Sequence, residues 1–208
     1  MTTPEDKERA AATIDPSSLK EAKEAIAVGC QPFLKRLDRL EGGLMRVRSA
    51  QDVNRFSRAL SMYLLASLPL KPVFCPFCVQ HSGGTRCQGC GYAETHGGRC
   101  DADASAFGQL VEAVIDLASE IHEVRESPSV PAIDPDEARE QLKDSIERSR
   151  GAARGFLAAT SEASVSGLME AKRVYIESIL KALPVDLIGS SEVFHSLEVV
   201  GSKLERYW

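Results

Sequence analysis

The sequence predicts a mainly α-helical protein, a bundle of about six helices with a small β-hairpin inserted near the middle of the chain. Ala, Leu, Glu, Lys and Arg dominate, and apolar residues recur every three or four positions, which is typical of amphipathic helices. The 208 residues are 43% hydrophobic, enough to bury a real core. Five of the six cysteines crowd into one short segment, which does not follow the helical pattern.

The first predicted helix begins between Asp15 and Ser18, where these side chains can cap its N-terminus and Glu21 can complete a capping box with Ser18. A polar lead, residues 1–14, precedes it, and the glycine pair at 42–43 ends or bends it. Its apolar residues share one face, so we expect that face to lie in the core.

Two further helices complete a first helical unit, residues 15–71 and 101–126. One spans about residues 50–68 and ends at a Leu-Pro step. The other begins near Asp101 or Asp103, either of which can cap it. Strand patterns are nearly absent from these residues, so the unit is expected to be helical throughout.

The helical pattern starts over after a linker at 127–133. "IDPSSLKEAKEAI" from Ile14 resembles "IDPDEAREQLKDSI" from Ile133 at an offset of 119 residues, and "YLLASLPL" resembles "SILKALPV" at an offset of 115. The last helix of each unit is offset by only 87, a shortfall of 28 that matches the length of the cysteine segment. The pattern favours a duplicated three-helix unit, with 134–208 as the second copy and 72–100 inserted in the first, although amphipathic helices also resemble one another by chance.

Two Cys-x2-Cys pairs lie eight residues apart within the inserted segment. A tight turn within each pair points two sulfurs at one centre, so two pairs can complete a tetrahedral metal site. Gly83 and Gly84 suit a hairpin turn that would bring the pairs face to face. The predicted metal ligands are Cys75, Cys78, Cys87 and Cys90.

Residues 72–100 resemble a zinc ribbon, and "CQGCGY" is similar to the knuckle of zinc ribbons and rubredoxins, where a glycine follows the second cysteine. In the first pair Val79 stands at that glycine's position, and the spacer is shorter than in a rubredoxin. Both departures favour zinc over iron. The resemblance implies a closed, structural Zn²⁺ site, and a rubredoxin-like iron site for electron transfer is the weaker alternative.

Three other side chains are candidate extra ligands. His81 lies between the pairs and is expected to face solvent rather than the metal. His96 and Cys100 follow the second pair, and Cys100 could be a spare ligand, a reactive thiol at a helix N-terminus or a packing residue. Cys30, on the apolar face of the first helix, is expected in the core.

Composition and motifs point away from catalysis. A closed four-cysteine site leaves no open position for water, and the chain has no GxxxxGK[ST] loop, HExxH or GxSxG motif. No apolar run is long enough to cross a membrane, and the acidic, polar start is unlike a signal peptide. We therefore expect a cytoplasmic protein, in which clustered cysteines hold metal more often than they form disulfides.

The leading functional hypothesis is a protein–protein interaction or assembly module. Phe74, Phe77 and Tyr92 lie beside the cysteine pairs and could anchor a partner if they are exposed on a metal-stapled hairpin.

Nucleic-acid binding is the alternative hypothesis, because a basic run follows two adjoining helices. The first 100 residues carry 14 Lys and Arg against 10 Asp and Glu, whereas the rest carry 11 against 20. Acidic residues interrupt the run, and a solvated helix face explains it equally well. The candidate contacts are Lys35, Arg36, Arg39, Arg46, Arg48, Arg55 and Arg58.

Overall fold

The chain, seen here as a computed structural model, is described over residues 2–83, 87–124 and 134–208. Within these ranges it forms nine α-helices and no strand, so it is mainly helical as predicted. The long helices are α2 (Pro16–Gly43), α3 (Ala50–Ala66), α6 (Ala106–Glu123), α7 (Pro135–Ser161), α8 (Val165–Ala182) and α9 (Ser191–Leu204). Among the described residues, no helix combines the length and apolar character that a membrane span needs.

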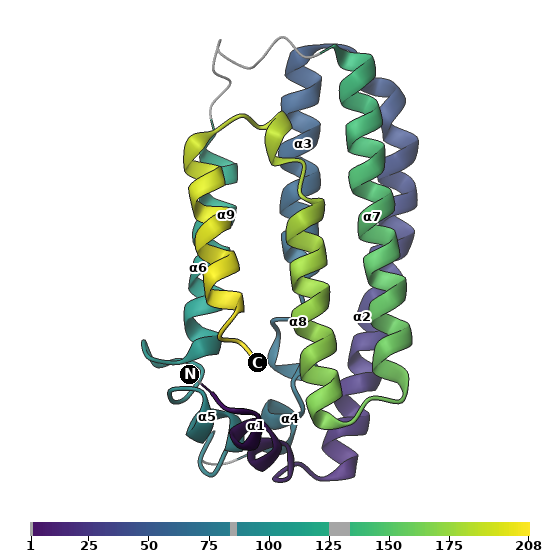
Figure 1. Cartoon of the computed structure of the whole chain (residues 1–208). Coiled ribbons are helices and arrows are strands. Elements are labelled where there is room, and N and C mark those ends of the chain that lie inside the picture. The colour runs from purple at the N-terminus through teal and green to yellow at the C-terminus, as the bar shows by residue number, and fades with distance from the viewer. Residues whose placement is uncertain (1, 84–86, 125–133) are drawn as a thin grey trace.

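The predicted number of about six helices is too small because three short helices close one end of the bundle (Figure 1). These are α1 (Pro4–Ala11), α4 (Pro76–Gln80) and α5 (Gly91–Thr95). Short 3-10 turns, η1 (Leu44–Arg46), η2 (Pro72–Phe74) and η3 (Val185–Leu187), join the longer elements.

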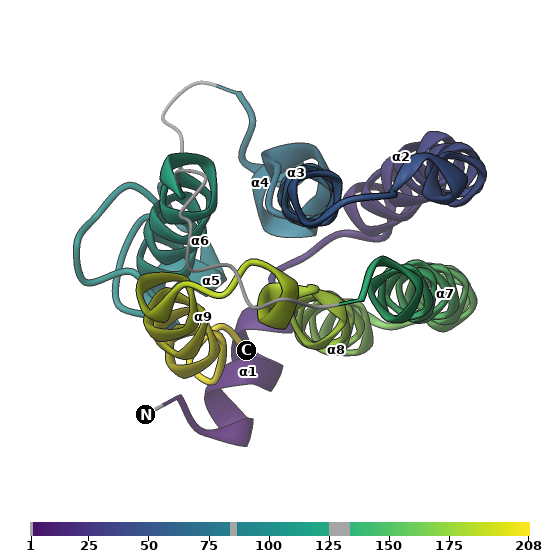
Figure 2. The same cartoon turned by 90° about the horizontal axis from the view of Figure 1, so that it is seen from above.

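The long helices lie in two rows when the bundle is viewed along its axis (Figure 2). One row is α6, α3 and α2, and the other is α9, α8 and α7, with contacts across the rows between α2 and α7, α3 and α8, and α6 and α9. Any antiparallel bundle with short connections can pack this way. The arrangement therefore does not test the duplication, which stays a prediction.

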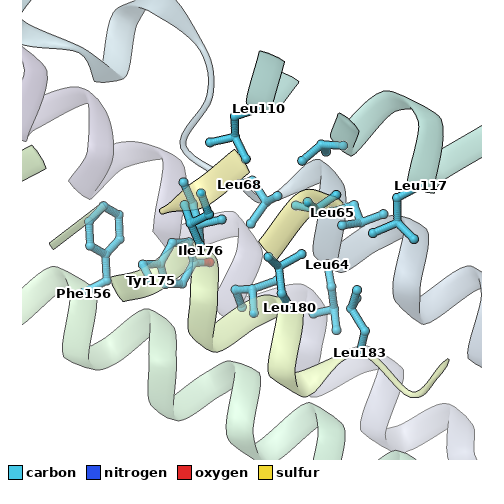
Figure 3. Packing of buried hydrophobic residues seen from close by; sticks show 14 of the residues in the cluster. Leu64, Leu65, Leu68, Leu110, Leu117, Phe156, Tyr175, Ile176, Leu180 and Leu183 are labelled. Carbon is cyan, nitrogen blue, oxygen red and sulfur yellow. The ribbon is translucent and has the colours of Figure 1, made fainter. Parts of the chain in front are cut away.

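The core lies between the two rows, where leucine and isoleucine side chains from α3, α6 and α8 interdigitate (Figure 3). Tyr175 of α8 stacks on Phe156 of α7 with ring centroids 4.6 Å apart. Burying one large apolar side chain completely stabilises the folded protein by about 1.5–3 kcal/mol. The central members are Leu64, Leu65, Leu110, Leu117, Ile176 and Leu180.

Helix α1 forms where only a polar lead was expected. Thr3 caps it and shares a capping box with Asp6, and Pro4 occupies the first helical turn. The helix buries Ala10 and packs against α5 and α8. The Thr-Pro-Glu-Asp start was a readable capping signal, but the single buried side chain left almost no apolar pattern.

Helix boundaries follow the local caps. The side chain of Asp15 accepts a hydrogen bond from the Ser18 backbone N–H at 2.8 Å, so α2 is capped by Asp15 alone and not by a Ser18–Glu21 box. Helix α6 begins at Ala106, later than expected, because the side chain of Ser105 caps it.

The predicted β-hairpin is wrong for the part of the cysteine segment that the structure describes. Each cysteine pair lies at the start of a short helix instead, with Cys75 before α4 and Cys90 before α5. Pro76 is well suited to the first turn of α4, because a helix leaves that N–H unpaired in any case. Gly84 of the predicted turn and the predicted linker, 127–133, lie outside the described residues.

Candidate metal centre

Five cysteines line one cavity of about 510 Å³ at the end of the bundle where α1, α4 and α5 lie (Figure 1). They come from the start of α4, the start of α5 and the loop before α6. Met169 of α8 and Phe107 of α6 also line the cavity, so the long helices form part of its wall. The five are Cys75, Cys78, Cys87, Cys90 and Cys100, and all are free thiols.

Cys75 and Cys78 lie one helical turn apart, which places their thiols close together. The Cys75 thiol is buried, and its hydrogen bond with Cys78 together with burial raises its pKa well above the usual value. A hydrogen bond with Cys100 is the main cause that raises the pKa of Cys78 to about 12. As free thiols these groups are therefore protonated near neutral pH, and a cation is needed to hold them as thiolates.

Cys90 is positioned by the N-terminus of α5. The backbone N–H groups of Tyr92 and Ala93 favour its thiolate, while burial outweighs them and raises its pKa. Cys87 lies close enough to interact electrostatically with Cys90, and it adopts a left-handed backbone with φ of 66°. Because residues other than glycine rarely adopt this backbone conformation, the turn before Cys90 is strained.

Cys100 reaches the cavity because the loop before α6 folds back on itself. The Ala106 N–H donates to the His96 carbonyl oxygen at 2.9 Å, which closes the loop. Gly97 has φ of 89°, and a Cβ there would lie 2.3 Å from the Ala104 carbonyl oxygen. Glycine is thus required at the turn that returns Cys100 to Cys78.

Lys172 of α8 lies buried beside the thiols. The side chain is fully inaccessible, and Nζ has no hydrogen-bond partner among the described residues. It lies 5.7 Å from the centroid of the Tyr207 ring and interacts electrostatically with the thiols of Cys75, Cys78 and Cys100. Burial lowers the pKa of Lys172, and the three cysteines oppose that shift. A buried ammonium without a neighbouring anion destabilises the folded state, so negative charge on this side of the cavity would be stabilising.

Aromatic residues beside the cysteines pack inward. Phe77 and Tyr92, expected as exposed partner contacts, are 1% and 3% exposed and pack against Trp208 with ring centroids about 6 Å away. The Tyr92 hydroxyl donates to the Tyr207 carbonyl oxygen at 2.9 Å. Phe74 is half-buried, because its ring packs against the Gly29 backbone of α2. Exposure was the wrong expectation for Phe77 and Tyr92, since the end of the chain covers them.

The two histidines of the segment differ in position. His81 lines the cavity, and its buried Nε2 has no hydrogen-bond partner within the described residues. His96 is buried outside the cavity lining, where its ring stacks on Tyr92 at 4.1 Å and on Trp208 at 5.3 Å. Burial lowers the pKa of His96 to about 4. Of the two, only His81 is placed to approach a metal.

The thiols share a cavity without forming a finished coordination shell. Outside residues 1, 84–86 and 125–133, no three His, Cys, Asp or Glu side chains are arranged so as to hold a metal ion. The donor set nevertheless fits zinc, because soft thiolates and a neighbouring cation suit a tetrathiolate. The cavity has room for the thiols to converge.

The basic run serves the fold at two of its positions. Arg58 Nε and Nη2 donate to the carbonyl oxygens of Ile121 and His122 at the end of α6. The Arg36 guanidinium lies 5.6 Å from the centroid of the Tyr63 ring. The exposed members are Lys35, Arg36, Arg39, Arg46, Arg48 and Arg55.

Sequence reasoning missed Lys172, although a signal was present. Leu168, Lys172 and Tyr175 occupy one face of α8 at spacings of four and three, so a lysine interrupts an otherwise apolar stripe. The docking of Trp208 had no comparable signal, since an aromatic end of the chain can equally lie on the surface. In comparisons with protein-family models, curated proteins and solved structures, this chain has no match.

Proposed function

We propose that this protein is a non-catalytic, zinc-binding helical protein that serves as an interaction or assembly module. The observation that carries the proposal is the convergence of five free thiols on one cavity, beside a buried lysine that lacks an anion. Neutral thiols do not balance that charge, whereas thiolates held by a divalent metal do. The predicted ligands Cys75, Cys78, Cys87 and Cys90 all belong to this cluster.

A bound zinc ion would supply the positive charge that keeps the cysteines ionised, and its role would be structural. The positions of the cysteines determine which elements a bound metal would link. Cys75 and Cys78 belong to the start of α4 and Cys90 to the start of α5. The neighbouring aromatic residues Phe77 and Tyr92 pack on Trp208. Metal binding should therefore stabilise the whole cysteine end of the bundle, including the docked end of the chain.

An interaction role has a candidate surface near this end. A hollow of about 230 Å³ lies between α2 and the η2 turn, lined by Gly29, Pro32 and Phe74 among others. Val28 and Val73, which directly precede Gly29 and Phe74, are 70% and 45% exposed. Exposed apolar side chains beside a hollow favour a protein partner.

Metal analysis combined with a visible spectrum tests the zinc assignment. Protein purified from its own host should carry one zinc per chain and be colourless, and Cys75→Ser with Cys78→Ser should lose the metal. Cys30→Ala is the matched control, because Cys30 is a buried residue of α2 and does not line the cavity of the five cysteines. Strong thiolate-to-iron absorption would replace the proposal with electron transfer, and metal-free protein from the host would refute both.

Nucleic-acid binding remains the second hypothesis, with less support. Arg58 is used to cap α6, and the remaining basic residues lie among Asp38, Glu41 and Asp52. Salt-sensitive binding that weakens when Arg36, Arg39 and Arg55 are replaced by Glu would favour it. Absence of a mobility shift at low salt would exclude it.

A further inference from the structure

The cysteine cluster offers five thiols to a metal that takes four. This question rests on the proposed function, because it asks which side chains hold the zinc proposed there. The two Cys-x2-Cys pairs make Cys87 the expected fourth ligand, yet Cys100 lines the same cavity. The two thiols differ in what surrounds them.

Cys100 lies against the first cysteine pair. Hydrogen bonding with Cys100 is the main influence on the pKa of Cys78, and hydrogen bonding with Cys78 is the main influence on that of Cys75, so these three thiols lie close together in the cavity. The loop that brings Cys100 there is fixed at both ends, by the 2.9 Å hydrogen bond from Ala106 to His96 and by the Ser105 cap of α6. Cys100 is therefore preorganised beside two predicted ligands.

The buried lysine gives an independent observation. Lys172 lies inside the protein with an unpartnered Nζ, and the thiols that interact with it are those of Cys75, Cys78 and Cys100. Because metal-bound sulfurs are anionic, the ammonium marks where negative charge is stabilised. Cys87 instead neighbours Cys90 across a strained turn.

We propose that Cys100 is a metal ligand, together with Cys75, Cys78 and Cys90, and that Cys87 is the spare thiol. Lys172 then acts as a positioning residue, whose positive charge offsets part of the net negative charge that four thiolates and one Zn²⁺ create. Zinc binding releases the protons of the four thiols to solvent. The spacing of the ligands becomes Cys-x2-Cys, eleven residues, Cys, nine residues, Cys.

Differential alkylation of the full chain tests this assignment without any substitution. The protein loaded with one zinc and the chelated protein are pulsed with N-ethylmaleimide, and the label at each cysteine is followed by peptide mass spectrometry. With free zinc at ten times its dissociation constant, labelling of Cys100 should slow by about tenfold. Labelling of Cys87 should slow far less than that of Cys100, and buried Cys30 is the internal reference.

A matched pair of variants supplies the second measurement. Cys100→Ser should lose zinc in a competition assay with a chromogenic chelator, whereas Cys87→Ser should bind it as the unchanged chain does. Unchanged labelling of Cys100 with protection of Cys87 would overturn this assignment and leave the proposed function intact. A chain that takes up no zinc at all would overturn the proposed function and this assignment with it.

Discussion

Replacing Lys172 with Met should change the stability of the metal-free and zinc-loaded protein in opposite directions. Methionine retains an unbranched apolar stem and fits an irregular buried site, so the packing volume is nearly preserved. The substitution removes a fully buried ammonium that has no hydrogen-bond partner within the described residues. The substitution stabilises the folded protein if no anionic site lies beside the ammonium, and it destabilises the protein if one does.

In the chelated protein the thiols are neutral, so Lys172 costs the folded state desolvation without a compensating ion. An unsatisfied buried polar group costs about 1–3 kcal/mol, and more if it is charged. Lys172→Met should therefore stabilise the chelated protein by about 1–3 kcal/mol, which corresponds to about 2–4 °C in Tm for each kcal/mol. In the loaded protein the charge supports the thiolates, and its loss should weaken zinc binding by about 10- to 100-fold.

Urea unfolding in chelator measures the first effect, and competition with a chromogenic chelator measures the second. Lys143→Met makes the same substitution at an exposed site on α7 and should change the free energy of unfolding by no more than about 0.5 kcal/mol. If Lys172→Met destabilises the chelated protein, or leaves zinc affinity unchanged, then Lys172 is not the counter-charge of a metal centre.

Three further substitutions test the packing at this end of the bundle. The pKa of His96 is about 4 in the folded protein and 6.5 in the unfolded chain, so the unfolded chain takes up the proton first as the pH falls. The free energy of unfolding in chelator should therefore fall by about 3 kcal/mol between pH 6.5 and pH 4. His96→Phe should abolish this pH dependence, which urea unfolding at a series of pH values measures. Gly91→Ala places a Cβ 3.0 Å from the backbone of Ala10 in α1 and should cost about 1–3 kcal/mol with faster hydrogen exchange in α1. Gly151→Ala is the control, because open space surrounds that position of α7, and it should stabilise the protein by about 0.5–1 kcal/mol. Tyr92→Phe leaves the buried Tyr207 carbonyl without its 2.9 Å partner and should cost about 1–3 kcal/mol in the same unfolding assay; an unchanged midpoint would contradict the docking of that segment.

The long helices were predictable because their signals are local. The side chains of Asp15 and Asp134 cap α2 and α7 at the two "IDP" starts, and the glycines at 42–43 end α2 as expected. Each of these helices carries an apolar face over many turns, so the pattern repeats often enough to be read. The cysteine cluster was predictable for the same reason, since short spacings limit how far two thiols can separate.

The structure of the cysteine segment was harder to predict because tertiary packing decides it. Glycines and metal-ligand spacing suggested a hairpin, but Pro76 and the buried Phe77 favour a helical turn that packs against α2. Nine residues separate Cys100 from Cys90, and only the folded loop with its glycine at 97 shows where that thiol lies. Long-range contacts of this kind leave no periodic signal in a single sequence.

The contacts around the cavity indicate why a metal here would act on more than its own loop. Tyr92 lies in α5 two residues after Cys90, and its ring and hydroxyl contact Trp208 and Tyr207. Helix α1 also packs against α5. Loosening the thiols would therefore release α5, and with it both α1 and the docked aromatic residues, as one cooperative unit. Because α1 and α5 have only 8 and 5 residues, neither is stable alone. The occupancy of the cysteine site should thus set whether this end of the bundle is ordered, which is the property that an assembly module would present to its partner.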